Sequence, residues 1–189
     1  MRIISGEFRG AVLHLRTGKN TRPLKDRAKE SIFNILTHSK KILFNLEKKK
    51  ILDLYSGTGS FGLECLSRKA FTVFFVEKEL EAINILSKNI NKLNLNNKTQ
   101  IIQGDVLEAV EKKLILKEKF DLIFCDPPFK DTNIEKLIKL IFDQNLLIKG
   151  GILIIHRKKT TKEKLPDCFR IIDERIYGIS KIIFGKFLS

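Results

Sequence analysis

Four acidic residues each stand at the end of an apolar run of the sequence, and they are Asp53, Glu77, Asp105 and Asp126. The distance along the chain between successive acids is long enough for one strand, one turn and one helix. Because consecutive parallel strands end at the same edge of a sheet, where such folds bind ligands, we expect the four carboxylates to line one cleft. A row of acids suits a cationic ligand that is rich in hydroxyl and amino groups, and it does not suit a bare pyrophosphate.

A glycine-rich loop follows the first of these acids. Residues 51–62 read ILDLYSGTGSFG, so that a GxGxxG pattern stands between a predicted strand and a predicted helix. In that context the glycines let the backbone approach a nucleotide-like ligand. An NAD-binding loop would place a pyrophosphate at the helix N-terminus and would gain nothing from a carboxylate at Asp53. S-adenosylmethionine has no phosphate, and it carries a sulfonium, an ammonium, a ribose diol and an adenine amine.

Each acid has a matching group on S-adenosylmethionine. Asp53 can receive the ammonium, Glu77 can accept from both ribose hydroxyls with its two oxygens, and Asp105 can accept from the adenine amine. A single acid could equally be the N-cap of the helix that follows it, whereas three acids in register after a glycine loop favour the ligand. The other residues that we assign to the cofactor site are Ser56, Gly57, Thr58, Gly59 and Val106.

The tetrapeptide Asp126-Pro127-Pro128-Phe129 follows the apolar run 120–125. Its two prolines remove two backbone donors, so carbonyls are the main-chain hydrogen-bonding groups at this point. The Asp126 side chain and the Pro127 carbonyl can accept both hydrogens of a nucleobase amine and turn its lone pair towards a methyl donor. Phe129 can stack on the base. We therefore predict that these four residues catalyse an in-line methyl transfer in which positioning supplies most of the rate advantage; a plain Pro-Pro turn is the simpler alternative.

The regular part of the chain predicts an α/β fold. Strand-like runs at 51–55, 72–77, 99–103, 120–125 and 151–156 alternate with helical patterns, of which 80–93 and 134–141 are the clearest. This alternation indicates a parallel sheet with helices on both faces. Two further strand-like runs, 168–176 and 179–188, have no helix between them and predict an antiparallel hairpin at the edge of the sheet.

The first 50 residues differ from the rest in charge. The chain of 189 residues has a net charge of +14, and this segment holds thirteen basic residues against four acidic ones. Residues 2–15 predict a β-hairpin, residues 16–23 a basic loop, and residues 24–36 a helix whose polar face carries Lys25, Arg27 and Lys29. Such an asymmetry favours a polyanionic partner, although a basic surface that only keeps the protein soluble explains the charge equally well.

The cysteines and the lengths of the apolar runs indicate in which cellular compartment the protein is expected. Cys65, Cys125 and Cys168 are odd in number and form no CxxC pair, so we interpret them as reduced thiols, not as a disulfide framework or a zinc site. The N-terminus lacks the apolar core of a signal peptide, and no apolar run reaches membrane-spanning length. We therefore expect a cytoplasmic protein without a metal and without a membrane partner.

These motifs resemble the RsmD family of bacterial 16S ribosomal RNA guanine-N2 methyltransferases nearly from end to end. Residues 2–10 and 21–36 are similar to the opening hairpin and the basic helix of the family. Residues 52–64 are similar to its cofactor loop, and Asp126-Pro127-Pro128-Phe129 to its catalytic loop. The resemblance implies S-adenosylmethionine as the donor and methylation of the exocyclic N2 amine of one guanine in 16S rRNA of the small ribosomal subunit.

The resemblance also implies an architecture. It is a class I methyltransferase fold, with a seven-stranded, mainly parallel sheet that ends in a C-terminal antiparallel hairpin. Residues 1–40 would form an RNA-contacting extension made of a small hairpin and a helix, and residues 41–189 the methyltransferase domain. By motif, the residues expected to contact RNA are Arg9, Arg22, Lys25 and Arg27.

We expect a monomer. His156 stands where the family usually has an acidic residue after the fifth strand, and we expect this departure to leave the core chemistry unaffected.

Three alternatives remain open at this point. The same chemistry could act on another amine, such as adenine N6 in RNA or DNA, because the DPPF motif alone does not separate the two targets. A Rossmann-type oxidoreductase would bind a nicotinamide cofactor and not S-adenosylhomocysteine. A non-catalytic RNA-binding assembly factor would bind the subunit but would not depend on Asp126.

Overall fold

The computed structural model describes residues 1–15, 26–112, 115, 118–162 and 164–188. The helices are α1 (Asp26–His38), α2 (Ser60–Ser67), α3 (Leu80–Lys92), α4 (Val106–Glu111) and α5 (Ile134–Asp143), with a 3-10 turn η1 (Asn96–Lys98). The strands are β1 (Lys50–Leu54), β2 (Thr72–Glu77), β3 (Thr99–Gln103), β4 (Phe120–Cys125), β5 (Leu147–Lys158), β6 (Phe169–Tyr177) and β7 (Ser180–Phe187).

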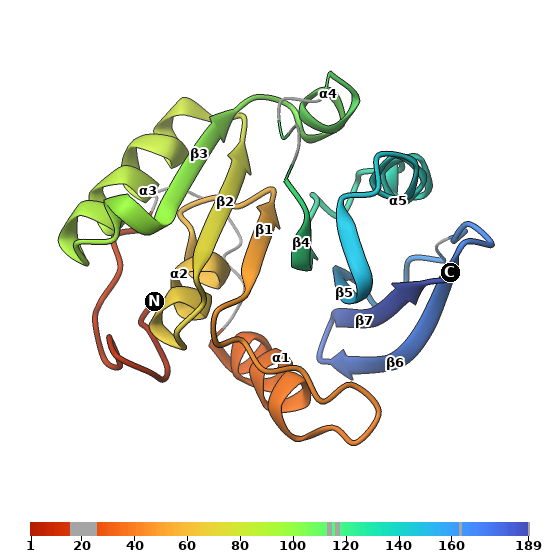
Figure 1. The fold of residues 1–189 in the computed structure, drawn as a ribbon, viewed down its shortest axis with the longest axis horizontal. Coiled ribbons are helices and arrows are strands. Elements are labelled where there is room, and N and C mark those ends of the chain that lie inside the picture. Colours follow the sequence, from red (N-terminus) through yellow and green to blue (C-terminus); the bar gives the residue numbers. More distant parts are fainter. Residues whose placement is uncertain (16–25, 113–114, 116–117, 163, 189) are drawn as a thin grey trace.

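All seven strands form one sheet in the order β3-β2-β1-β4-β5-β7-β6 (Figure 1). β1 to β5 pair in parallel, whereas β7 runs antiparallel to both β5 and β6. The predicted fold is therefore confirmed, including the C-terminal hairpin. The strand order reverses between β1 and β4, and this switch point is where open α/β sheets bind ligands.

β5 begins earlier than the sequence predicts. Leu147 pairs with Phe120, the register then shifts, and Ile152 pairs with Leu122. Gly150 lies inside this irregularity with φ 80°, a backbone conformation that glycine adopts without strain. Because Gly150 and Gly151 interrupt the apolar run, the sequence pattern predicts a strand only from residue 151 onwards.

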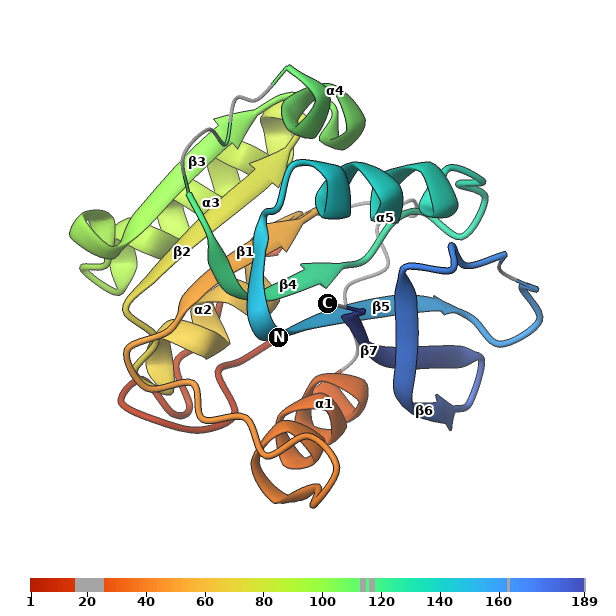
Figure 2. The same ribbon diagram turned by 45° about the vertical axis from the view of Figure 1, so that its right-hand side comes forward.

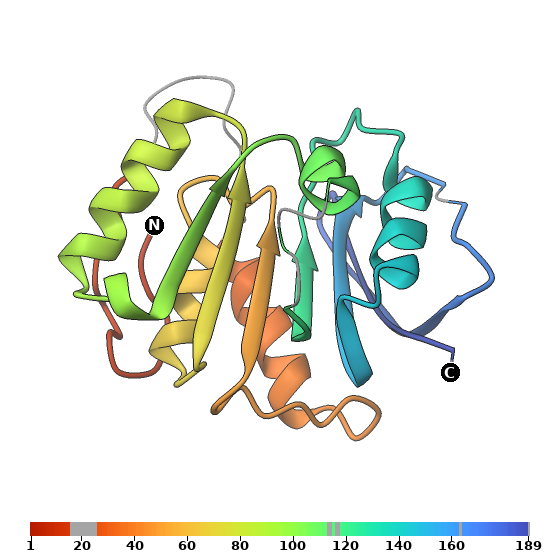
Figure 3. The ribbon, with the colours of Figure 1, turned by 45° about the horizontal axis from the view of Figure 1, so that its top comes forward.

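Helices cover both faces of the sheet. α1, α2 and α3 pack on one face and α4 and α5 on the other, each face with its own cluster of buried apolar residues (Figures 2 and 3). The alternation of side chains along a strand divides the residues between the two clusters. In β5, Ile152 and Ile154 face the first cluster, whereas Leu153 and Ile155 face the second.

The N-terminal segment folds back on itself and packs against α2. The predicted hairpin is present as a short antiparallel loop with one bridge, Arg2 to Val12. Its tip bonds to α2 because Glu7 N donates to Ser67 O at 2.8 Å. A Cβ at Gly6 would lie 1.9 Å from Ser67 O, so only glycine permits this approach. Ile3 and Leu13 belong to the same apolar cluster as the sheet, and the domain division at residue 40 stays a prediction.

α1 differs from the sequence prediction at Lys29. Arg27 is exposed as expected and Lys25 lies outside the described residues, but Lys29 is completely buried. Its spacing from Ile32, Phe33 and Leu36 places it on the buried face of the helix. Lys29 Nζ donates to Arg2 O at 2.9 Å and to Ser60 Oγ at 3.2 Å. The prediction that Lys29 lies on a solvated polar face is therefore wrong.

Glu64 of α2 gives this buried ammonium its counter-charge. Its carboxylate lies 3.6 Å from Lys29 Nζ, accepts from Arg68 Nε at 2.9 Å, and is itself fully buried. It also accepts from the backbone N–H groups of Ile4 and Ser5, at 2.7 and 3.0 Å. One side chain thus joins the N-terminal segment, α1 and α2.

Replacing Glu64 by Ala is expected to destabilise the fold. The change removes a carboxylate from beside a buried ammonium and takes the acceptor from two backbone donors, so the free energy of unfolding should fall by about 3–5 kcal/mol. Urea denaturation measures it. The control is Glu108→Ala, which removes an exposed pair with Lys112 and should cost about 0.5 kcal/mol or less. Equal losses for the two variants would contradict the assignment.

Among the described residues, no helix is both long and apolar enough to cross a membrane.

Candidate active site

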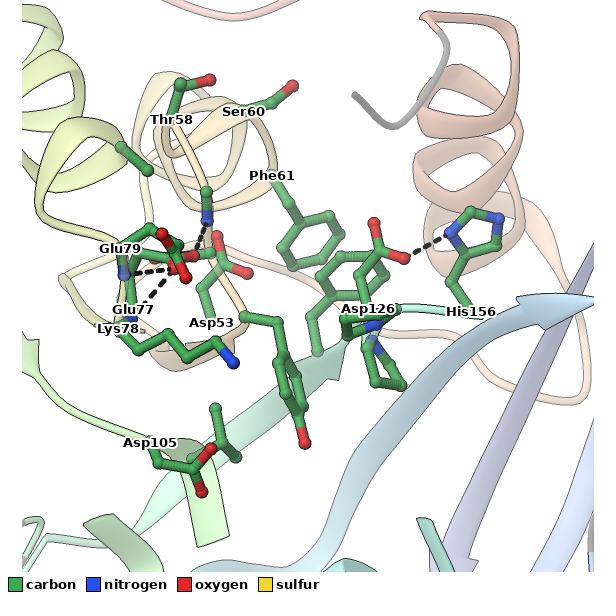
Figure 4. Close-up of a pocket in the computed structure, with 18 of the residues that line it drawn as sticks. Asp53, Thr58, Ser60, Phe61, Glu77, Lys78, Glu79, Asp105, Asp126 and His156 are labelled. Carbon is green, nitrogen blue, oxygen red and sulfur yellow. Dashed lines mark hydrogen bonds and ion pairs between the residues drawn. The ribbon is translucent and has the colours of Figure 1, made fainter. Parts of the chain in front are cut away.

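A cavity of about 750 Å³ opens at the carboxyl ends of the parallel strands (Figure 4). All four acids from the sequence prediction line it, although they come from four different strand ends. Of the residues assigned above to the cofactor and to catalysis, the lining includes Asp53, Ser56, Gly57, Thr58, Glu77, Asp105, Val106, Asp126, Pro127, Pro128 and Phe129. The common cleft that the spacing predicted is therefore present.

Gly59 is the member of the predicted cofactor set that does not line the cavity. It has φ 83°, and a Cβ there would lie 2.3 Å from Leu86 Cδ1. Its hydrogen lets the loop pack tightly against α3. Sequence reasoning assigned Gly59 to ligand contact, and in the structure this position serves close packing.

Glu77 holds the glycine loop in place. Its Oε2 accepts from Gly57 N at 2.7 Å, and its Oε1 accepts from Lys78 N and Glu79 N, both at 2.9 Å (Figure 4). A carboxylate offers about four acceptor positions, so one remains for a ligand hydroxyl. The side chain that was predicted to bind a ribose thus also fixes the shape of the loop beside it.

Asp53 is buried beneath the loop, and its Oδ2 accepts from Gly62 N in the first turn of α2 at 2.9 Å. Burial raises the pKa of Asp53 well above its ordinary value. The hydrogen bond from Gly62 lowers this pKa, and the negative charges of Asp126 and Glu77 raise it further. A cationic group beside Asp53 would offset this cost. The electrostatics of the cavity therefore favour a ligand with a positive charge at this end.

The raised pKa predicts a dependence of stability on pH. Folded Asp53 keeps its proton to a higher pH than in the unfolded chain, so the stability of the ligand-free protein falls as pH rises from the ordinary value of 3.8 towards the folded pKa. Asp53→Asn removes the ionisable group, and with it this loss of stability, and keeps a side-chain oxygen that accepts from Gly62 N. We expect the variant to have a higher Tm than the wild type at pH 7 and a smaller difference at pH 4, measured by differential scanning calorimetry. The same Tm difference at both pH values would contradict this.

Asp105 fits the helix-cap alternative as well as the cavity. Its Oδ1 accepts from Leu107 N at 2.9 Å and from Glu108 N at 3.5 Å, so it is the N-cap of α4. The side chain lines the cavity at the same time. Contact with an adenine amine stays a prediction for this residue.

Arg157 supports the Asp126-Pro127-Pro128-Phe129 loop from behind. It is buried, and its guanidinium donates to Pro128 O at 3.1 Å and to Asp131 O at 2.5 Å. Tyr55 OH reaches Asp131 Oδ2 at 3.4 Å. No hydrogen bond from a described residue reaches the Pro127 carbonyl. The loop is therefore held by its neighbours while this acceptor stays available to a ligand.

His156 is the hydrogen-bond partner of Asp126. The distance between His156 Nδ1 and Asp126 Oδ1 is 2.7 Å, and the imidazole is buried. Its ring meets the ring of Phe129 edge-on, with centroids 5.6 Å apart. His156 thus contacts two of the predicted catalytic residues, which the sequence did not lead us to expect; its effect on the chemistry stays a prediction. The strand pairing could have revealed it, because Cys125 pairs with Ile155 and the next residues along each strand are Asp126 and His156.

Aromatic residues and the N-terminal segment also line the cavity, and the sequence analysis did not predict this. Phe61 stacks on Phe124 with centroids 4.0 Å apart, and both line the cavity. Met1 and Leu15 line it as well. Helical or strand periodicity marks such residues only as buried, and it does not show which of them border a cavity.

Of the predicted RNA-contacting residues, the structure describes Arg9 and Arg27, and neither lines the cavity. Arg9 and Arg27 are exposed, and Arg22 and Lys25 lie outside the described residues. Within the described part of the chain, no group of three His, Cys, Asp or Glu side chains is arranged to hold a metal ion.

Known proteins are similar to this chain in both sequence and fold. The family described as Conserved hypothetical protein 95 matches residues 1–186. The ribosomal RNA small subunit methyltransferase D of Haemophilus influenzae is 31% identical over 180 residues, which cover 95% of this chain and 90% of that protein. The chain belongs to the RsmD family.

Solved structures extend the comparison for this RsmD-family member. The Haemophilus influenzae protein HI0767 superposes with a TM-score of 0.78 at 27% identity, covering 100% of this chain and 98% of that one. SMU.776, solved in complex with SAH, superposes with a TM-score of 0.64 at 15% identity, covering 83% of this chain and 48% of that one. The second likeness shows the shared methyltransferase fold alone.

Proposed function

We propose that this RsmD-family protein transfers a methyl group from S-adenosylmethionine to the exocyclic N2 amine of one guanine in 16S rRNA. The observation that carries the proposal is one cavity in which a row of carboxylates adjoins the Asp126-Pro127-Pro128-Phe129 loop. The name of the Haemophilus influenzae relative supports small-subunit rRNA as the substrate. We further propose that the protein acts as a cytoplasmic monomer and that residues 1–40 contact the RNA.

The residues of the cavity fit S-adenosylmethionine. A volume of about 750 Å³ is within the range of sites for ligands of this size. The buried Asp53 suits the ammonium, Glu77 has an acceptor position left for the ribose, and Asp105 with Val106 borders the place for the adenine. The loop residues Ser56, Gly57 and Thr58 would lie along the methionine part. When bound, S-adenosylmethionine supplies an electrophilic methyl group, and the complex of SMU.776 with SAH supports this donor.

The DPPF loop would bind and orient the accepting amine. Asp126 Oδ1 is occupied by His156, so Oδ2 can accept one amine hydrogen while the Pro127 carbonyl accepts the other. Both bonds turn the lone pair of the nitrogen out of the ring and towards the methyl donor. Phe129 would stack on the base. No strong base is needed before attack, because the nitrogen becomes cationic when it takes the methyl group, and this acidic product then releases a proton.

Mapping of modified nucleotides tests the proposal. The 16S rRNA from cells that lack this protein is compared, by mass spectrometry of nuclease fragments, with that from cells complemented by the wild type or by Asp126→Ala. We expect one N2-methylguanine to be absent without the protein and to return only with the wild type. A missing N6-methyladenine would assign another target, and a modification restored by Asp126→Ala would support an assembly factor instead.

A further inference from the structure

Four exposed lysines either follow the DPPF loop or lie at or just after the end of β5 in the sequence, and they are Lys130, Lys158, Lys159 and Lys162. We call them the C-terminal lysine rim. Lys130 directly follows Phe129, and Lys158 is the last residue of β5, two residues after His156. The basic residues that motifs assign to RNA contact all lie in the first 27 residues, so this group is distant from them in the sequence.

The register of the sheet places Lys158 next to the candidate catalytic residues. β4 and β5 run parallel with Cys125 opposite Ile155, and the bond between Asp126 and His156 continues this alignment. Side chains alternate along a strand, so Lys158 lies on the same face of β5 as His156. In Figure 1 the N-terminal segment lies on the left and β5 to β7 on the right, with β1 and β4 between them. Lys130 and Lys158 are therefore close in sequence to Phe129 and His156, which line the cavity, and they lie directly after the DPPF loop and at the end of β5, not in residues 1–15.

The backbone of the rim is held in a defined turn. Thr161 donates twice to Lys158 O, from N at 3.0 Å and from Oγ1 at 2.9 Å. Lys159 N donates to Ile179 O at 2.8 Å, and Lys181 Nζ donates to Thr161 O at 2.8 Å. These bonds tie the turn to β7. A partner that binds the rim would therefore order little backbone, which favours affinity.

The charge of the rim is not neutralised by other described residues. Several other lysines form ion pairs, for example Lys49 with Asp121 and Lys112 with Glu108. Within the described part of the chain, none of the four rim ammonium groups does so. The cavity is lined by carboxylates, which repel phosphate. This arrangement suits a nucleotide whose base enters the cavity while its phosphates stay outside, against the lysines.

We propose that the C-terminal lysine rim binds RNA phosphates on one side of the target nucleotide. This inference rests on the proposed function, and it adds a second contact surface to the N-terminal one. Each lysine–phosphate contact releases counterions, so the affinity of the RNA should depend on salt through these residues.

The test compares two triple variants with the same change of charge. The first, Lys158→Gln with Lys159→Gln and Lys162→Gln, removes most of the rim and leaves Lys130 beside the catalytic loop. The control changes Lys48, Lys98 and Lys119 to Gln, which are exposed and precede β1, β3 and β4 at the opposite edge of the sheet. Binding to small ribosomal subunits from cells lacking this protein is measured at several KCl concentrations, together with methyl transfer to the same subunits.

We expect the rim variant to reduce the slope of log affinity against log salt by about 2–3, since each of three phosphate contacts contributes roughly 0.7–0.9. KM for the subunit should rise while kcat at saturation stays unchanged, and the control should keep the wild-type slope. Equal slopes for the two variants would overturn the inference even if the wild type methylates the subunit. If the wild type binds the subunit but does not methylate it, the proposed function is wrong, while the salt slopes still show whether the lysine rim binds RNA. Absence of binding by the wild type would overturn both.

Discussion

Replacing Asp126 by Ala is expected to lower kcat for methyl transfer by about 10²–10³ while leaving the affinity for S-adenosylhomocysteine nearly unchanged. The carboxylate accepts an amine hydrogen only when the base is in place, so its loss affects the transition state. It makes no hydrogen bond to the glycine loop, which Glu77 and Asp53 hold. Single-turnover kinetics with small subunits and calorimetry with S-adenosylhomocysteine measure the two quantities.

His156→Phe is the graded comparison for this variant. It removes the 2.7 Å bond to Asp126 but keeps a ring next to Phe129. Because one hydrogen bond to a charged group contributes about 1.5–3 kcal/mol, we expect a loss of kcat smaller than that of Asp126→Ala and in the same step. Loss of cofactor binding with normal turnover, in either variant, would reverse the assignment of the DPPF loop to chemistry.

Glu77→Ala should have the opposite profile, a large loss of cofactor affinity before any effect on the chemical step. The change leaves three backbone N–H groups without their acceptor, that of Gly57 in the glycine loop and those of Lys78 and Glu79 directly after β2. Each unsatisfied donor costs about 1–3 kcal/mol if it stays buried, and the predicted ribose contact is lost as well. We expect the Kd for S-adenosylhomocysteine, measured by calorimetry, to rise by about 100-fold or more.

Two further variants separate loop geometry from net charge. Glu77→Gln keeps the size of the side chain but turns an amide NH₂ towards backbone donors, so it should lose much of the affinity too. Glu111→Ala removes one exposed acid of α4, paired with Lys136, and should leave the Kd unchanged. A wild-type Kd for Glu77→Ala would show that the glycine loop holds its shape without this carboxylate.

Local patterns in the sequence were sufficient for the sheet and for the row of acids. Alternation of apolar runs and helical spacing is a property of short segments, and parallel strands place their ends together whatever their order. Hence 53, 77, 105 and 126 were predicted to share a cleft, and they do. The glycine pattern located the turn before α2 for the same reason, because positive φ at Gly57 and Gly59 is a local requirement.

Tertiary structure alone decided which partner each polar side chain has. The sequence predicts Lys29 to be solvated, whereas in the structure it is buried and lies next to the carboxylate of Glu64 from another helix. From the sequence we expected the replacement of an acidic residue by His156 to have no effect on the chemistry, whereas the pairing of β4 and β5 places His156 next to Asp126. Asp105 and Glu77 could each be a cap or a ligand group, and only the positions of nearby N–H donors show that they already serve the backbone. Such pairings depend on packing between distant segments, and the periodicity of one segment contains no information about its neighbour.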